Sequence, residues 1–248
     1  MQRAEPAEPL CLKSMDAAYL MTFEANVAAV PPEGVVLDET FFYPVGGGQE
    51  ADQGMLTIPG GASIKVTDVR RMSGKIVHRL PKGSTSAFQI GMHLTGEIDW
   101  KRRHTNMRLH TAQHLLSALA YKQFKLRTEK ASMAGRKGHL DLEGALPPGV
   151  GFEDIEAEAN NTYFTRPVPV TIQFVTRAEF EAMPGRSNAK ALPPGVTNVR
   201  LIIIEGIDRC ACGGTHVRST EEIGAVKLFP PTPTQNGGQR LSFELAGD

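Results

Sequence analysis

Residues 107–124 read MRLHTAQHLLSALAYKQF and show the strongest periodic pattern of the chain. Five apolar residues of this stretch fall near one face of a helix, namely Met107, Ala112, Leu115, Leu116 and Leu119. This spacing predicts a helix that ends near Phe124. His110 and His114 lie about one turn apart on it, so both imidazoles are expected to project from the same face.

The chain upstream of residue 99 shows a different pattern, in which short apolar runs alternate with turn residues. Strands are predicted in three stretches: Val35–Leu37, Met55–Ile58 and Ile64–Arg70. Glycine-rich turns separate them. We therefore expect residues 1–98 to form a small antiparallel β-barrel. A helix is predicted at Ala17–Val30, because Leu20, Phe23 and Val27 recur at three- and four-residue steps and two prolines follow.

Downstream of the central helix, helical and strand patterns are mixed. A second helix is predicted at Phe152–Phe164, and strands are predicted near Val168–Val175 and Val199–Ile204. The change of period near residue 99 marks a domain boundary. The predicted fold class is thus α+β, with a β-barrel domain at 1–98 and an α+β domain at 99–248.

The composition is that of an ordinary globular protein. Of the 248 residues, 41% are hydrophobic and 22% are charged. The 27 basic residues balance the 27 acidic ones, so any contact with nucleic acid must come from a local patch. No apolar run approaches the roughly 20 residues of a membrane-spanning helix, and the first residues do not resemble a signal peptide. A cytoplasmic protein without membrane contact is expected.

The cysteines point to metal binding rather than to a disulfide. Only one residue separates Cys210 from Cys212, which makes this pair a poor disulfide candidate. The segment Cys212-Gly213-Gly214-Thr215-His216 offers a thiolate and an imidazole on a Gly-Gly turn. Two histidines four residues apart are weak support by themselves. Together, His110, His114, Cys212 and His216 predict one zinc ion per chain.

Three motifs carry a resemblance to a known family. HTAQHLL at residues 110–116 and CGGTHV at 212–217 resemble the two metal motifs of the alanyl-tRNA synthetase editing domain and of the freestanding AlaX proteins. FYPVGGGQ at 42–49 is similar to the glycine-rich segment of the larger AlaX proteins. The resemblance runs from about Ala17 to about Phe243. No aminoacylation domain precedes the motifs, which implies a freestanding editor. Glu129 stands where the synthetase domain usually has glutamine, and its role is left open.

The resemblance implies hydrolysis in trans of misacylated tRNA(Ala), with seryl-tRNA(Ala) as the first candidate substrate and glycyl-tRNA(Ala) as the second. Zinc would lower the pKa of a bound water or polarise the ester carbonyl. Four protein ligands also describe a closed structural site, so the alternative is a zinc-stabilised RNA-binding module without activity. A zinc peptidase is disfavoured, because Gln113 lies within a motif that lacks the glutamate of His-Glu-x-x-His. The oligomeric state is left open.

Alanine is smaller than serine, so a pocket that admits serine cannot exclude alanine by size. Selection of serine therefore requires a group that forms a hydrogen bond with the serine hydroxyl. The candidates for substrate binding are Thr40, Gly46, Gly47, Gly48, Gln49, Thr111 and Gln113. The candidates for contacts with acceptor-stem phosphates are Lys101, Arg102, Arg103 and Arg108, just upstream of the metal helix motif. A solvated helix start is the alternative for this run. A second, more dispersed basic patch comprises Lys122, Lys125, Arg127, Lys130, Arg136 and Lys137.

Overall fold

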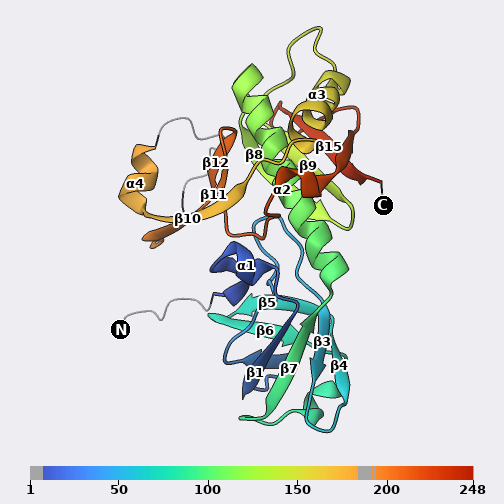
Figure 1. Ribbon diagram of the computed structural model, residues 1–248, viewed down its shortest axis with the longest axis vertical. Coiled ribbons are helices and arrows are strands. Elements are labelled where there is room, and N and C mark those ends of the chain that lie inside the picture. The colour runs from blue at the N-terminus through green and yellow to red at the C-terminus, as the bar shows by residue number, and fades with distance from the viewer. Residues whose placement is uncertain (1–7, 184–191, 193, 248) are drawn as a thin grey trace. The chain divides into compact units, whose positions relative to one another are not determined.

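The computed structural model describes residues 8–183, 192 and 194–247. The chain divides into two compact units, Met1–His104 and Thr105–Asp248 (Figure 1). The division falls inside helix α2 (Trp100–Phe124). We describe the two units separately as the first unit and the second unit. The expected domain boundary near residue 99 stays a prediction.

The first unit is built on one antiparallel sheet of seven strands in the order β4-β3-β7-β1-β2-β6-β5. The strands are β1 (Thr22–Ala29), β2 (Gly34–Leu37), β3 (Gly54–Thr57), β4 (Ser63–Val66), β5 (Asp68–Met72), β6 (Lys75–Arg79) and β7 (His93–Ile98). Its helices are short: η1 (Leu10–Leu12), α1 (Met15–Ala18) and η2 (Ser84–Ala87). The core contains Phe42, Leu56, Val66 and Val69, each fully buried.

The expected closed barrel is wrong, because this sheet is open, with β4 and β5 at its two edges. Only Thr67 separates these two strands along the chain. A hairpin needs a loop of at least about two residues, so β4 and β5 cannot fold back onto each other as a hydrogen-bonded pair. Thr67 lies between the two edge strands, and the ladder that would close the barrel is not formed.

The expected helix at Ala17–Val30 is also wrong. The helical segment α1 ends at Ala18, and β1 occupies most of the predicted range. In β1 the buried residues Phe23, Ala25 and Val27 alternate with exposed ones. The four-residue step from Phe23 to Val27 fits one face of a strand as well as one face of a helix. Pairing of β1 with β2 and β7 decides between the two.

The second unit contains helix α2 and two antiparallel sheets. One sheet has the order β10-β11-β12 and the other the order β13-β15-β9-β8, with β14 paired to β15. The strands are β8 (Thr128–Ala134), β9 (Lys137–Leu142), β10 (Val170–Thr176), β11 (Asn198–Ile204), β12 (Asp208–Ala211), β13 (Ala225–Leu228), β14 (Thr232–Pro233) and β15 (Gln239–Ala246). The remaining helices are α3 (Phe152–Glu158), the π-helix η3 (Ala159–Phe164), α4 (Arg177–Ala182) and η4 (Thr220–Ile223).

These bounds confirm the second predicted helix, which α3 and η3 form together over Phe152–Phe164. They also confirm the two predicted strands as β10 and β11, which pair from Val170↔Ile204 to Thr176↔Asn198. The helix predicted to end near Phe124 is α2, and it does end there.

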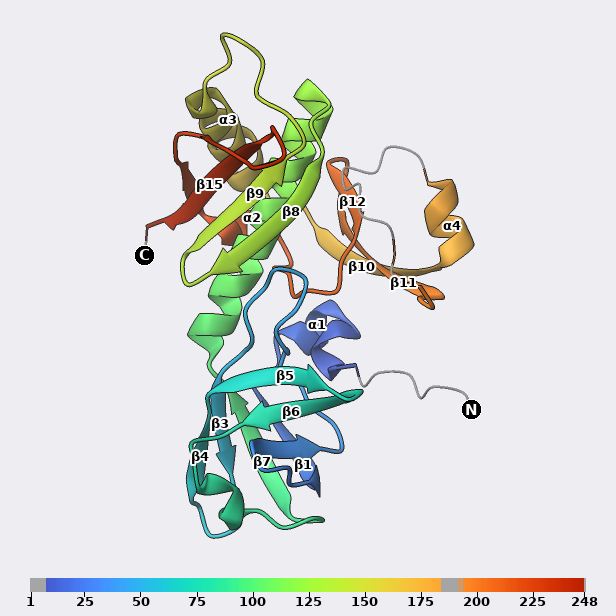
Figure 2. The ribbon, with the colours of Figure 1, turned by 180° about the vertical axis from the view of Figure 1, so that it is seen from behind.

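Helix α2 is more buried than one apolar face predicts, since every residue from Leu109 to Ala120 is buried. The two sheets lie on different sides of this helix in both ribbon views (Figures 1 and 2). A helix covered on both sides must place its polar side chains where they find partners. That condition applies to His110 and His114, at the centre of α2. Among the described residues, no helix is both long enough and apolar enough to cross a membrane.

Candidate metal centre

Four side chains of the second unit converge on one point. His110 and His114 come from α2, and Cys212 and His216 come from the segment that follows β12. One ligand atom from each lies within 4.8 Å of the others. The Cys212 Sγ lies 3.3 Å from Nε2 of His110 and 3.3 Å from Nε2 of His216. In a tetrahedral zinc site the N-to-S separation is about 3.5 Å, so this cluster could hold a metal ion of that size.

Arg200 of β11 fixes the turn that carries Cys212 and His216 by hydrogen bonds to the backbone of the turn. The Arg200 guanidinium donates to the backbone oxygen of Cys212 at 2.7 Å and to that of Gly214 at 2.9 Å. The Gly214 N–H donates to the Cys212 Sγ at 3.4 Å. The Gly-Gly turn therefore folds the thiolate and the following imidazole toward α2, as the sequence predicts, and Arg200 fixes it there.

Each of two histidines is oriented by a hydrogen bond at its other nitrogen. His114 Nδ1 lies 3.1 Å from Asp208 Oδ2. His216 Nδ1 lies 3.1 Å from Thr111 Oγ1, whose hydroxyl donates to the Met107 carbonyl at 3.0 Å. Because that hydroxyl has one proton, its oxygen accepts from His216 Nδ1–H. Both rings thus turn Nε2 toward the cluster, an arrangement common around metal-binding histidines.

The charges in the cluster favour a thiolate. Burial raises the pKa of the Cys212 thiol, but the imidazoles of His110 and His216 outweigh burial and hold this pKa well below its usual value. Burial lowers the pKa of His114, but the hydrogen bond to Asp208 and the neighbouring Cys212 raise it to about 10. A metal ion binds the thiolate and the unprotonated Nε2, so it would replace the proton that His114 holds in the absence of metal.

Sequence reasoning missed Asp208 and Arg200. Asp208 is buried and belongs to a second group of close ligand atoms with His114 and Cys210. The even spacing of Asp208, Cys210 and Cys212 is the signal that could have found it, because alternate residues of a strand share one face. The bond from Asp208 to His114 makes this carboxylate an orienting group behind the four-residue cluster.

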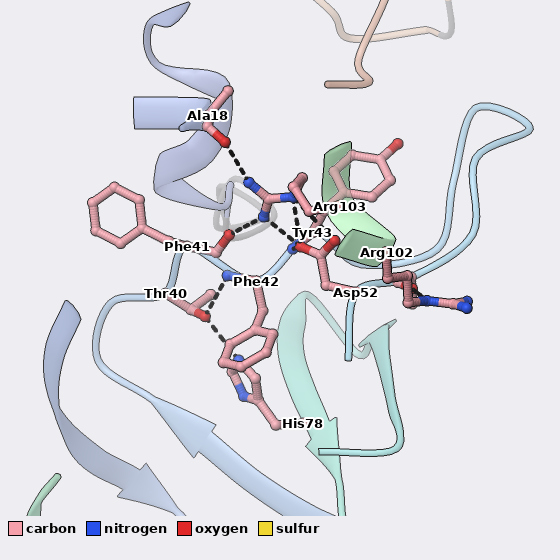
Figure 3. A network of polar contacts seen from close by, with 10 residues as sticks. Ala18, Thr40, Phe41, Phe42, Tyr43, Asp52, His78, Arg102 and Arg103 are labelled. Atoms are coloured by element: carbon pink, nitrogen blue, oxygen red, sulfur yellow. Dashed lines mark hydrogen bonds and ion pairs between the residues drawn. The ribbon is translucent and has the colours of Figure 1, made fainter. Parts of the chain in front are cut away.

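The structure places Arg103 in a buried network of the first unit, shown in Figure 3. Its guanidinium donates to the Asp52 carboxylate, to the Ala18 carbonyl at 2.8 Å and to the Phe41 carbonyl at 2.6 Å. The Tyr43 N–H donates to the same carboxylate at 2.6 Å. Arg103 is fully buried, so it is not free to bind phosphate. The expected basic patch is corrected on this point.

The other residues of that basic patch have different surroundings. Arg102 donates to the Ala51 carbonyl at 2.8 Å and forms an ion pair with Glu50 at 3.1 Å. Arg108 donates to the Ile223 carbonyl at 3.0 Å. Lys101 is exposed. Both arginine side chains therefore form intramolecular hydrogen bonds. Their contacts with RNA stay a prediction, as does that of Lys101.

The glycine run forms a tight turn in the first unit. Gly46 and Gln49 exchange backbone hydrogen bonds of 2.9 and 3.2 Å, and between them Gly47 and Gly48 have φ of 58° and 83°. Left-handed values at both central residues are those of a type I′ turn, which favours glycine. This turn explains the glycines by conformation alone, and the role of the Gly46–Gln49 segment in substrate binding stays a prediction.

The remaining substrate candidates lie in hydrogen-bonded pairs. The Thr40 hydroxyl bonds to His78 Nε2 at 2.8 Å in the core of the first unit (Figure 3). Gln113 donates through Nε2 to the Ser117 hydroxyl at 2.8 Å, and Ser117 bonds to Thr128 at 2.7 Å. Thr111 contacts the four-residue metal-binding cluster through its hydrogen bond with His216. Thr40 belongs to a separate buried network in the first unit.

Two family models match the chain. The model described as tRNA synthetases class II (A) matches residues 13–102. The model described as threonyl and alanyl tRNA synthetase second additional domain matches residues 199–241. The second match includes the turn that carries Cys212 and His216.

Curated relatives match over nearly the whole chain. The alanyl-tRNA editing protein AlaX-M of Saccharolobus solfataricus is 32% identical, with 96% of this chain and 98% of the relative covered. AlaX-M of Methanosarcina barkeri is 34% identical, with 92% and 95% covered. The alanine–tRNA ligase of Sulfurisphaera tokodaii is 36% identical over 93% of this chain, but only 25% of that larger enzyme is covered.

Proposed function

The chain belongs to the AlaX-M family of alanyl-tRNA editing proteins, and from this premise we propose that it hydrolyses misacylated tRNA(Ala) in trans. The resemblance expected from the sequence is thereby confirmed. The observation that carries the proposal is the convergence of His110, His114, Cys212 and His216 on one point. Seryl-tRNA(Ala) and glycyl-tRNA(Ala) are the proposed substrates.

We propose that the four side chains hold one zinc ion. Three imidazole nitrogens and one thiolate are donors that zinc accepts in tetrahedral sites, whereas magnesium and calcium prefer oxygen. When bound, zinc supplies a Lewis acid that polarises the ester carbonyl or acidifies a water molecule. The substrate is already an activated ester, so the remaining task of the protein is to orient it and stabilise the developing oxyanion.

The protein's own residues prepare this site by fixing the imidazoles. Asp208 orients His114, and Thr111 orients His216 through hydrogen bonds of 3.1 Å each. The Thr111 oxygen also accepts from the Val217 N–H at 3.2 Å. Because this hydroxyl already donates once and accepts twice, we assign Thr111 mainly to positioning His216.

Recognition of the serine hydroxyl is proposed for Gln49 and Gln113. Each amide can donate and accept a hydrogen bond. Gln113 Nε2 donates to Ser117, so its amide oxygen is the proposed acceptor for the serine hydroxyl. A site built to bond a hydroxyl can reject an analogue without it by about 10⁴ to 10⁵. Thr40 is left out of this proposal because its hydroxyl bonds to His78.

The second candidate function is a zinc-stabilised RNA-binding module without activity. The observation that favours it is the number of donors, since four protein ligands complete a closed tetrahedral site, whereas catalytic zinc sites usually keep one position open. In the active alternative one of the four ligands would be weakly bound, or zinc would order the pocket and the substrate while another group activates the water.

The deciding experiment offers the purified protein seryl-, glycyl- and alanyl-tRNA(Ala) and measures the release of amino acid together with zinc per chain. The proposal expects hydrolysis of the seryl and glycyl esters, sparing of the alanyl ester and close to one zinc. A full zinc content with no hydrolysis of any ester would select the binding module instead.

A further inference from the structure

A groove in the second unit lies between the C-terminal end of α2 and the turn that joins β11 to β12. Its volume is about 400 Å³. Its lining includes Tyr121, Lys122, Lys125, Ile203, Ile207 and Arg209. We call it the Lys122 groove. The side chains combine an apolar and aromatic wall with three cations, and the proposed chemistry uses none of them.

The three cations of the Lys122 groove are exposed. In the part of the chain that the structure describes, no ion pair with a carboxylate is found for Lys122, Lys125 or Arg209. The one carboxylate in the lining is Asp208, which is bonded to His114. The groove therefore presents uncompensated positive charge in a chain whose formal net charge is zero.

Tyr121 adds an aromatic surface to this charge. The Lys125 ammonium lies 5.8 Å from the centre of its ring, and the Arg127 guanidinium lies 5.6 Å from it. Basic side chains beside a partly exposed aromatic ring are the combination by which proteins hold single-stranded nucleic acid, with phosphates on the cations and bases stacked on rings.

The backbone at Lys125 is a second, independent observation. Its φ is 59°, in the left-handed region, and it follows the last residue of α2 directly. The Leu126 N–H then donates to the Ala120 carbonyl at 3.3 Å and closes the helix. Glycine is the usual residue at this position, because it adopts such a φ without strain. Lysine stands here instead of glycine, and its ammonium donates to the Lys122 carbonyl at 3.4 Å, so this charge stays at the wall of the groove.

We propose that the Lys122 groove binds the single-stranded 3′ end of the tRNA, upstream of the esterified nucleoside. Phosphates would contact Lys122, Lys125 and Arg209, and a base would pack on Tyr121. Asp208 lines the groove and bonds to His114, so bound RNA lies one side chain away from the metal cluster. This inference rests on the proposed function for the identity of the RNA.

The test compares two triple variants of the full chain. The groove variant carries Lys122→Ala, Lys125→Ala and Arg209→Ala. The control carries Lys65→Ala, Lys75→Ala and Lys82→Ala, which removes the same charge from exposed positions of the first unit that belong to neither basic patch. Binding of tRNA(Ala) is measured over a range of salt concentrations. The groove variant should bind at least about tenfold more weakly than the control, with a log-log salt slope smaller by about 2, since each lost single-strand phosphate contact removes about 0.7.

A seryl ester of adenosine separates this proposal from the proposed function. It has the reactive ester but none of the upstream phosphates, so the groove variant should hydrolyse it as fast as wild type while losing activity on seryl-tRNA(Ala). Equal tRNA affinities and salt slopes for the groove and control variants would overturn the groove proposal, even in an active enzyme. A wild-type protein that binds tRNA through the groove but hydrolyses no ester would instead overturn the proposed function.

Two single variants test the nature of the ligand. Lys125→Gly should leave the fold as stable as wild type or more stable, because glycine relieves the left-handed strain, yet it should weaken tRNA binding. Tyr121→Leu should weaken binding by about 5- to 100-fold if a base stacks on the ring, whereas Tyr121→Phe should retain it. Unchanged binding in both Lys125→Gly and Tyr121→Leu would contradict the proposal.

Discussion

Two buried polar clusters in this protein differ in how their groups are satisfied. In the first unit, the Arg103 guanidinium is matched by the Asp52 carboxylate and by two backbone carbonyls. In the second unit, the ligand atoms of His110, His114, Cys212 and His216 lie within 4.8 Å of one another. The first cluster is satisfied by the protein's own groups, whereas the second brings together ligand atoms that could hold a metal ion. A buried group of ligand atoms that converge on one point is thus the better sign of a binding site.

The largest expected effect follows from removing half of the metal cluster. Cys212→Ala with His216→Ala should abolish binding of the one zinc ion and lower deacylation by on the order of 10³-fold or more, since orienting groups alone are worth about 10- to 100-fold. Metal analysis and a deacylation assay check this. Cys210→Ala is the matched control and should keep both zinc and activity. If the double variant still bound one zinc ion per chain, the assignment of Cys212 and His216 as metal ligands would be wrong.

The next effect concerns the buried ion pair of Arg103 and Asp52 in the first unit. Arg103→Met leaves the Asp52 carboxylate buried without its partner, which should lower the free energy of unfolding by about 3 to 5 kcal/mol. The double variant Arg103→Met/Asp52→Leu should recover part of this loss. Arg102→Ala, whose ion pair with Glu50 is partly exposed, should cost less than about 1 kcal/mol. Urea unfolding measures all three, and equal losses for Arg102→Ala and Arg103→Met would contradict the comparison.

These two clusters also mark how far the sequence could predict the structure. Each half of the metal set follows from a local rule, a four-residue helical step for His110 and His114 and a Gly-Gly turn for Cys212 and His216. The meeting of the two halves, 102 residues apart, was predicted from their combination of donors and from the resemblance to the editing domain. Arg103 was assigned to RNA, because nothing local reveals that Asp52, 51 residues earlier, packs against it. The barrel and the helix at Ala17–Val30 failed for the same reason, since strand pairing and closure depend on contacts between distant residues. The Lys122 groove likewise joins Lys122 to Arg209, a proximity that no sequence period encodes.

A third effect distinguishes a buried neutral histidine from the histidines of the metal cluster. Burial lowers the pKa of His78 to about 4 and outweighs the hydrogen bond to the Val35 carbonyl, which raises it. Between pH 6.5 and 4 the unfolded chain binds a proton at His78 and the folded chain does not, so stability should fall as the pH falls, by on the order of 3 kcal/mol in total. Urea midpoints at several pH values check this. His78→Gln is the control, because it keeps every other histidine, and an unchanged pH slope would contradict the prediction.

A smaller effect is expected from the group behind the metal cluster. Asp208→Asn keeps the size of the side chain but weakens its hydrogen bond to His114 Nδ1. Zinc affinity should fall by about 10- to 100-fold without complete loss of the metal. Competition with a zinc chelator measures this affinity. If Asp208 were instead a ligand in place of Cys212, Asp208→Asn and Cys212→Ala would reduce the zinc affinity equally.

The smallest effect tests whether the first unit contributes to chemistry as well as to structure. Gln49 closes the glycine turn through its backbone, and its side chain is the proposed partner of the serine hydroxyl. Gln49→Ala should lower the rate on seryl-tRNA(Ala) by on the order of 1 to 2 kcal/mol, or roughly 5- to 30-fold, without changing the zinc content. Glycyl-tRNA(Ala) has no hydroxyl to lose, so its rate should fall much less. The ratio of the two rates is therefore the informative quantity. Equal losses on both substrates would mean that Gln49 supports the turn or the RNA end, and the first unit would then act through its fold alone.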